Sequence, residues 1–278
     1  MERSYAFKTL QIKARQQVYT LLSGNHLSKQ HGEGYDFSEL REYHIGDDVR
    51  KINWSISAKL GKPYIKELHS NRELSVVIAA MMGGSLHFAK DRAKQDTLSE
   101  IATILGYAAR QSGDLFTGHC CTASEIRSTP PTKQLYHIEQ FSNTLFICDT
   151  LGSKVDYTAT LQTLFYRISR PSLLFVIGDF LENVDLSLLA QKHEVIAIIV
   201  RHREEEHPQK LGEVILQDPQ SSATINTYFA HKSIKNYLAK LKEHDEKLIE
   251  HFSRYGIRYT KIFTDEEAIV KLLGLFRG

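Results

Sequence analysis

The chain has 278 residues, of which 42% are hydrophobic and 24% are charged, and its formal net charge is +2. This composition is ordinary for a soluble globular protein, and the small net charge argues against a dedicated nucleic-acid surface or a polybasic membrane patch. The three cysteines, Cys120, Cys121 and Cys148, make neither a disulfide framework nor a zinc pattern. We expect them to be buried thiols in a reducing compartment.

No stretch of the sequence has the pattern of an export signal or a membrane span. The first thirty residues lack a continuous apolar run, and nowhere do about eighteen apolar residues follow one another. We therefore expect a cytoplasmic protein without direct membrane insertion.

The N-terminal part predicts a helix followed by an unusual polar segment. Apolar positions recur among basic and polar residues over 5–22, which is typical of a short amphipathic helix. In residues 32–68, glycines, acids, arginines and the only tryptophan alternate with aliphatic and aromatic residues. This segment is too charged for a core and too apolar for a linker. We expect residues 1–70 to pack on a main domain formed by residues 71–278.

Strands and helices alternate through the rest of the chain. Continuous apolar runs predict buried strands at 73–82, 172–180 and 194–200, and we expect further strands at 115–123 and 258–264. Helical spacing predicts helices from Thr97 to Gly113, at 133–148, at 161–168, at 186–189, at 231–255 and near the C-terminus. This alternation favours a parallel α/β sheet covered by helices on both faces.

Three segments of this region carry more specific expectations. Within 133–148 the letters TLFIC would also fit a strand, and the charged residues 203–209 predict an exposed loop. Asp218-Pro219 lies between two short apolar runs and predicts a hairpin at the sheet edge. His119 precedes the cysteine pair, and we interpret it as a core residue because no second set of ligands is spaced to help it bind a metal.

Four strings occur in one order along the chain: GEGYDFSELREYHIGDDVRKINW (32–54), AKLGKPYIKE (58–67), SGDLF (112–116) and FVIGDFLENVDLSLLAQKHEVIAIIV (175–200). With them the chain resembles the bacterial domain-of-unknown-function family number 58, from about residue 12 to the C-terminus. The resemblance implies a von Willebrand factor A-like, Rossmann-type α/β fold with a mostly parallel sheet, an N-terminal polar-rich extension and a small edge hairpin. It also implies association with a MoxR-type AAA+ ATPase, because such ATPases are often encoded beside members of the family.

The resemblance further implies where a metal site would lie. Von Willebrand factor A domains bind a divalent cation through a DxSxS turn after the first buried strand, a threonine on a second loop and a later aspartate. The turn falls on residues 81–85, so Met81 stands in place of the aspartate and Gly83 in place of the first serine. The threonine position falls on Val155, or alternatively on Thr158 or Thr160, and the later aspartate is Asp179.

Only Ser85 and Asp179 therefore remain as oxygen ligands of that site. A thioether such as that of Met81 is a soft ligand and does not replace a carboxylate around Mg²⁺. We expect a degenerate metal-ion-dependent adhesion site and no cofactor, with Mg²⁺ disfavoured. Asp179 fits equally well as a turn or helix-capping residue.

The signature segment has two interpretations that are compatible with each other. Its acids and arginines fit an internal salt-bridge network that clamps the segment to the sheet, with glycines supplying unusual backbone angles. Arginine and tryptophan are also the residue types that dominate protein interfaces. The residues of this partner-binding or structural signature are Gly34, Asp36, Phe37, Arg41, Tyr43, Gly46, Asp47, Asp48, Arg50 and Trp54.

Two functions of different class follow from these patterns. The first is a non-catalytic interaction module or adaptor that works with a MoxR-type AAA+ ATPase and other proteins, and not with nucleic acid. The second is a metal-dependent enzyme of the hydrolase type that uses Asp179 and the acids of the 36–48 segment. The sequence favours the first, because it shows no nucleophile paired with a base.

Overall fold

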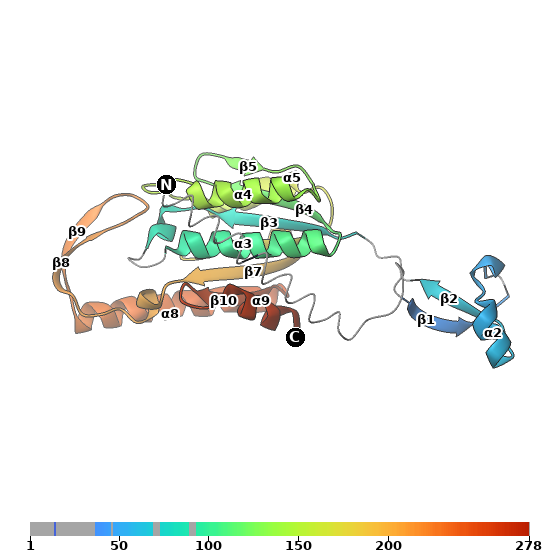
Figure 1. The fold of residues 1–278 in the computed structure, drawn as a ribbon. Coiled ribbons are helices and arrows are strands. Elements are labelled where there is room, and N and C mark those ends of the chain that lie inside the picture. Colours follow the sequence, from blue (N-terminus) through green and yellow to red (C-terminus); the bar gives the residue numbers. More distant parts are fainter. Residues whose placement is uncertain (1–13, 15–36, 46, 69–72, 89–92, 278) are drawn as a thin grey trace. The chain divides into compact units, whose positions relative to one another are not determined.

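The computed structural model describes residue 14 and residues 37–45, 47–68, 73–88 and 93–277 (Figure 1). The chain divides into a smaller unit, Leu21–Glu73, and a larger unit formed by Leu74–Gly278 together with Met1–Thr20. The helix expected at 5–22 lies outside the described residues except for Ala14, which is helical and buried. The packing of residues 1–70 on the main domain stays a prediction.

The larger unit is built on one six-stranded sheet. Its spatial order is β10 (Arg258–Phe263), β7 (Glu194–Arg201), β6 (Leu173–Gly178), β3 (Ser75–Met81), β4 (Leu115–Cys121) and β5 (Ile126–Ser128). All neighbours pair in parallel except β4 and β5, which are antiparallel. The five runs expected to be strands are thus the five parallel strands, and the expectation of a mostly parallel α/β sheet is confirmed. β10 differs from the others in being exposed or half-buried except at Ile262.

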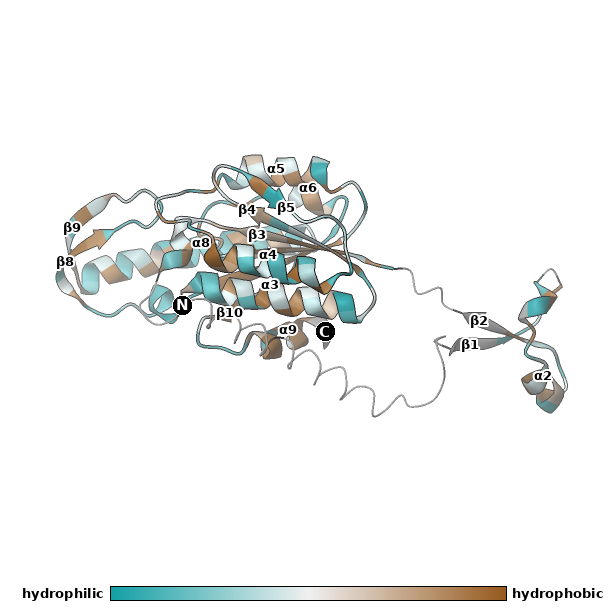
Figure 2. Ribbon diagram, turned by 45° about the horizontal axis from the view of Figure 1, so that its top comes forward, coloured by the Kyte–Doolittle hydropathy of each residue, from teal (hydrophilic) through white to brown (hydrophobic). Residues whose placement is uncertain are grey.

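Helices cover both faces of this sheet (Figures 1 and 2). One face carries α3 (Lys94–Gln111), α4 (Leu135–Ile147) and α9 (Ala268–Arg277), and the other carries α5 (Tyr157–Arg167), α6 (Ser187–Ala190) and α8 (His231–Arg254). Side chains alternate along a strand, so Val77, Ala79 and Met81 of β3 join the core cluster that contains residues of α5, α6 and α8. The segment 133–148, which also fitted a strand in part, is helical.

The order in which strands are added to the sheet reverses between β3 and β6. From β3 the chain adds β4 and β5 on one side, then returns to place β6, β7 and β10 on the other side. Open α/β sheets bind ligands outside the carboxyl ends of their strands at such a switch point. The ends of β3 and β6, which are Met81 and Gly178, are therefore the place to look for a site.

The structure corrects three expectations for the larger unit. The hairpin of β8 (Gly212–Gln217) and β9 (Thr224–Phe229) forms a separate two-stranded sheet and does not extend the main one. Residues 203–209 are not only an exposed loop, because α7 (Arg203–Glu206) is helical and buries Glu205. Cys148 is only half-buried, whereas Cys120 and Cys121 are buried as expected. The short edge strand β5 had no signal in the sequence.

The smaller unit is a hairpin with two short helices inserted between its strands. β1 (Phe37–Glu42) pairs antiparallel with β2 (Tyr64–Leu68), and η1 (Val49–Lys51) and α2 (Trp54–Leu60) lie between them. Asn53 caps α2 by accepting a hydrogen bond from the Ile56 amide, and Gly61 ends it with φ of +69°. Within the described residues 37–45 and 47–68, the polar-rich segment therefore forms regular elements, as its mixed composition indicates.

Candidate functional site

Residues assigned to the metal turn and to the second loop lie together at the carboxyl end of β3. Met81 is buried in the core, and a Cβ built on Gly83 would be 3.7 Å from Ser85 Oγ and 3.8 Å from Val155 Cγ2. Thr150, which was not among the threonine positions considered, is the one whose hydroxyl reaches this turn, donating to the Gly83 carbonyl oxygen at 3.2 Å. Thr158 is exposed and Thr160 lies within α5.

Asp179, directly after β6, is buried and receives hydrogen bonds from several directions. Lys94 Nζ lies 3.0 Å from its Oδ2, the Ser85 side chain also bonds to it, and the Leu181 amide lies 3.4 Å from Oδ1. Burial would raise the pKa of this carboxyl, but the Lys94 charge and the Ser85 hydrogen bond outweigh burial and lower it. Asp179 is thus an ionised turn residue that is bound to a lysine.

The backbone that follows Asp179 is strained. Phe180 has φ of +49°, in the left-handed region, which costs a residue other than glycine on the order of 1–3 kcal/mol. Its ring is buried with centroids 6.2 Å from Tyr157 and 6.0 Å from Phe252, and His244 Nε2 donates to its carbonyl oxygen at 2.7 Å. This packing fixes the turn and so fixes where the Asp179 carboxylate points.

Lys94 is the first residue of α3, and its side chain is fully buried. Its ammonium contacts Asp179 and also Glu205, with Nζ 2.6 Å from Glu205 Oε1. The other oxygen of Glu205 accepts a hydrogen bond from the His202 amide at 2.8 Å as part of the capping box of α7. Sequence reasoning missed both residues, because Glu205 stands in the charged string REEE and Lys94 in the polar string AKQD.

A second set of buried and half-buried charges lies beside this one, at the ends of β7 and β10. Arg201 is fully buried and donates to Asp245 Oδ1 of α8 at 2.9 Å. Lys261 lies 2.8 Å from Asp245 Oδ2 and 2.6 Å from Glu206 Oε1. The carboxyl edge of the sheet therefore carries two groups of acids, and each group is paired with basic side chains.

Asp47 and Asp48 of the smaller unit are also bound by basic side chains, and Glu42 pairs with Lys62 at 2.9 Å. Arg41 donates to both oxygens of Asp47, at 2.8 and 2.7 Å, and the His44 amide donates to Asp47 Oδ2 at 2.8 Å. These hydrogen bonds lower the pKa of Asp47 to about 2. Asp48 caps η1 and pairs with Arg50, whose side chain is 87% exposed. Gly34, Asp36 and Gly46 lie outside the described residues, and Phe37 begins β1.

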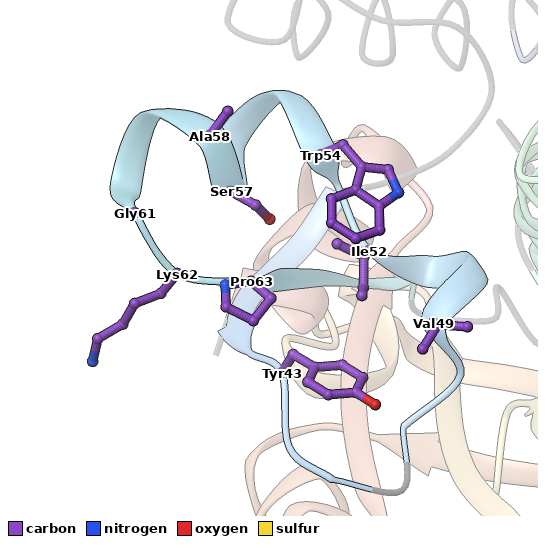
Figure 3. Close-up of a pocket in the computed structure, with 9 residues that line it drawn as sticks. All are labelled: Tyr43, Val49, Ile52, Trp54, Ser57, Ala58, Gly61, Lys62 and Pro63. Carbon is purple, nitrogen blue, oxygen red and sulfur yellow. The ribbon is translucent and has the colours of Figure 1, made fainter.

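An apolar groove of about 540 Å³ opens on the smaller unit (Figure 3). Trp54 is 68% exposed and Val49 57% exposed, and Figure 3 shows Trp54, Ile52, Val49 and Tyr43 along one side of the groove and Lys62 at its other end. Ser57 accepts a hydrogen bond from the Tyr64 amide at 2.8 Å, which holds α2 against β2. The signature residues Tyr43 and Trp54 thus line one surface.

Within the described part of the chain, no group of three or more His, Cys, Asp or Glu side chains is placed to hold a metal ion. Among the helices that the structure describes, none is both long enough and apolar enough to cross a membrane.

Comparisons with known proteins place the chain among proteins without an assigned activity. It is 26% identical over 223 residues to the uncharacterized proteins Rv1480 of Mycobacterium tuberculosis (strain H37Rv) and Mb1516 of Mycobacterium bovis, an alignment that covers 78% of this chain and 70% of each relative. Among solved structures it is similar to the conserved hypothetical protein BatB from Bacteroides thetaiotaomicron, with 14% identity and a TM-score of 0.44 over 74% of this chain and 100% of that one. A second similar structure is an aerotolerance-related membrane protein from Bacteroides fragilis, with 12% identity and a TM-score of 0.45 over 73% of this chain and 97% of that one.

The family described as "Protein of unknown function DUF58" matches residues 39–247, which is more than half of the chain and runs from within β1 through β9 and most of α8. The match includes the residues that line the groove of the smaller unit and also Lys94, Asp179 and Glu205 of the larger unit, whereas Lys261 lies beyond it. The chain belongs to the DUF58 family.

Proposed function

We propose that this protein is a non-catalytic interaction module with a von Willebrand factor A-like fold and a degenerate metal-ion-dependent adhesion site, which acts in the cytoplasm with a MoxR-type AAA+ ATPase. The observation that carries the proposal is the exposed apolar groove of the smaller unit. Trp54 and Val49 are open to solvent there, and large exposed apolar side chains in one patch mark interaction sites. The ATPase itself is implied by the family resemblance.

The groove has the residue composition of a protein interface, and an ion pair fixes the loop next to it. Trp54 and Tyr43 belong to the residue types that contribute most to binding free energy, and Arg50, which follows the groove residue Val49 in the chain, is 87% exposed. The bidentate Arg41–Asp47 pair fixes the loop that connects Tyr43 to η1. A surface that is fixed before binding loses less conformational entropy when a partner docks.

The arrangement of charges supports a metal-dependent hydrolase less well than it supports an interaction module. Such a site needs carboxylates that are open to a metal and to substrate. Asp179 is bound by Lys94, Asp47 by Arg41 and Asp48 by Arg50. Asp179, Asp47 and Asp48, which the enzymatic interpretation would use, are therefore already engaged by basic side chains, and Glu42 of the same segment pairs with Lys62.

The test is direct binding between this protein and a MoxR-type ATPase from the same organism, measured by biolayer interferometry. Trp54→Ala and Arg50→Glu are expected to weaken the affinity, with a loss of about tenfold or more for Trp54→Ala if it is a hot spot. Tyr166→Ala is the matched control, because Tyr166 is 80% exposed on the larger unit and lies outside the groove. Circular dichroism confirms that each variant is folded.

Equal affinities for the wild type and Trp54→Ala would contradict the role of the groove. Absence of binding by the wild type, with and without ATP, would contradict the choice of partner. Hydrolysis of a generic phosphoester that is stimulated by Mg²⁺ and lost in Asp179→Ala would favour the enzyme instead.

A further inference from the structure

The ammonium of Lys94 is enclosed by oxygen atoms from separate loops. Asp179 follows β6, Glu205 lies in α7 after β7, and Ser85, which bonds to Asp179, follows β3. The ring of Phe88 lies on another side, with its centroid 5.8 Å from Nζ. All of these segments meet at the carboxyl edge of the sheet, where the fold would place a ligand.

Burial of a lysine side chain at the start of α3 is energetically unfavourable unless the charge is paired. Lysine is almost never fully buried unless it is paired, and moving an ammonium out of water is unfavourable unless close opposite charges offset the loss. Lys94 is also the first residue of α3, where the partial positive charge of the helix N-terminus disfavours a cation. Its position is therefore explained only by the two carboxylates that it contacts.

The carboxylates and the hydroxyl have the chemistry of a site for a hard cation. Divalent ions such as Mg²⁺ and Mn²⁺ bind oxygen ligands that converge from several loops. In this structure, however, the space between Asp179 and Glu205 holds an ammonium, 3.0 and 2.6 Å from their nearest oxygens. The arrangement as it stands does not fit a metal, since the cation is already present.

We propose that Asp179, Glu205 and Ser85 form a cation site whose cation is the Lys94 ammonium, so that the chain carries its own replacement for a divalent ion. In this interpretation the buried lysine excludes the metal, and the change at Met81 is not the sole reason for its absence. The lysine ties α3, the end of β6 and α7 together, as a bound metal would. The proposal does not depend on the interaction function proposed above.

The experiment removes the ammonium and offers Mn²⁺ in its place. Lys94→Ala leaves space between the carboxylates, and we expect it to bind one Mn²⁺ per chain by calorimetry and electron paramagnetic resonance. Its unfolding temperature should rise by roughly 5 °C at Mn²⁺ concentrations a hundred times Kd. The wild type should show neither effect, and Lys94→Ala combined with Asp179→Asn should lose both.

Two further variants separate the site from general effects of charge. Lys94→Met removes the charge but fills the space, so it should be destabilised and Mn²⁺ should not restore its unfolding temperature. Lys154→Ala removes a lysine from the exposed pair with Glu182, and its response to Mn²⁺ should equal that of the wild type.

Three results would overturn the proposal. The first is Mn²⁺ binding by the wild type that disappears in Asp179→Asn, because the site would then be open despite Lys94. The second is a folded Lys94→Ala that binds no Mn²⁺. If Lys94→Ala does not fold alone, it is refolded with Mn²⁺ or with choline chloride at equal ionic strength. Recovery of the fold with Mn²⁺ but not with choline chloride supports the proposal. The third contradictory result is recovery with neither salt.

Discussion

Gly84 lies directly against the backbone of Pro219: a Cβ at position 84 would be 2.1 Å from the Pro219 carbonyl oxygen. Through this contact the turn of the β8–β9 hairpin packs on the loop that follows β3. The same carbonyl oxygen accepts a hydrogen bond from the Gly152 amide at 2.8 Å, and the Gly84 amide donates to the Ser153 carbonyl oxygen at 2.8 Å. The second glycine after β3 is therefore needed for backbone packing.

Substitution of this glycine by alanine should destabilise the larger unit. The Gly84→Ala methyl group would overlap backbone atoms that cannot rotate away, and overpacking of this kind typically costs about 1–3 kcal/mol. Urea denaturation measures the free energy of unfolding. Gly83→Ala is the matched control, because its φ of −103° suits alanine and its nearest neighbours would be 3.7 Å away. Equal stability of the two variants would contradict this account of Gly84.

The Arg41–Asp47 pair should make the stability of the fold depend on pH in acid. The pKa of Asp47 is lowered from 3.8 to about 2, first by the hydrogen bond from Arg41 and then by the His44 amide. A depressed carboxyl pKa stabilises the fold above the unfolded value and loses that contribution as pH falls. The contribution of Asp47 should therefore be complete above about pH 4 and disappear as pH falls through 2.

Titration of the Asp47 carboxyl by NMR checks this directly. Arg41→Gln should raise the measured pKa of Asp47 towards 3.8, because the largest cause of the shift is removed. Arg50→Gln is the control, since Arg50 pairs with Asp48 and is exposed. A pKa of Asp47 that does not change in Arg41→Gln would show that another group holds it low.

Patterns of apolar residues predicted most of the larger unit, because buried parallel strands are continuous apolar runs and covering helices have one apolar side. β3, β6 and β7 are of this kind, and Gly113, with φ of +79° just beyond α3, is the expected helix-ending glycine. β5 escaped prediction because it is three residues long and mostly exposed at the sheet edge.

Only two of the four residues of the candidate site were predicted from the sequence. Asp179 and Ser85 were assigned through the family resemblance, and both lie just after buried strands, whose ends meet at one edge of the sheet. Lys94 and Glu205 are charged residues in charged strings, and such strings normally indicate solvent-exposed surface. Lys94 and Glu205 neutralise each other's charge where both are buried, and a single sequence carries no local signal for a pair 111 positions apart.

Because His119 is buried, we expect the protein to become less stable in weak acid. Burial, together with the nearby charge of Arg167, lowers its pKa from 6.5 to about 4, and its Nδ1 lies 2.8 Å from Ser128 Oγ. The unfolded chain takes up a proton here before the folded chain does. The free energy of unfolding should therefore fall by about 3 kcal/mol between pH 6.5 and 4 on account of this residue.

His119→Asn tests this assignment, because the amide can still hydrogen-bond to Ser128 but does not titrate. Its free energy of unfolding, measured by urea denaturation at several pH values, should depend less on pH than that of the wild type over this range. His193 is also partly buried with a lowered pKa, so part of the wild-type dependence should persist. Identical dependence in both proteins would exclude His119 as its source.

The three thiols differ in environment although two are adjacent in sequence. Cys120 and Cys148 lie within hydrogen-bonding reach of each other, and this contact, assisted by the charge of Arg127, lowers the pKa of Cys148 to about 7. The same contact and burial raise the pKa of Cys120, and burial raises that of Cys121 to about 12. Because the thiolate is the reactive form, Cys148, which is half-buried, should be the reactive one.

Alkylation of the native protein by iodoacetamide, followed residue by residue with mass spectrometry, should modify Cys148 first, at a rate that rises through an inflection near pH 7. Cys121 should stay unmodified until the chain unfolds. Cys120→Ala removes the largest cause of the shift, so the inflection for Cys148 should move towards the ordinary value of 9.0. Arg127→Gln should move it in the same direction by less, because the arginine charge is a smaller cause than the thiol contact. An inflection that is the same in the wild type and Cys120→Ala would show that the neighbouring thiol does not stabilise the Cys148 thiolate.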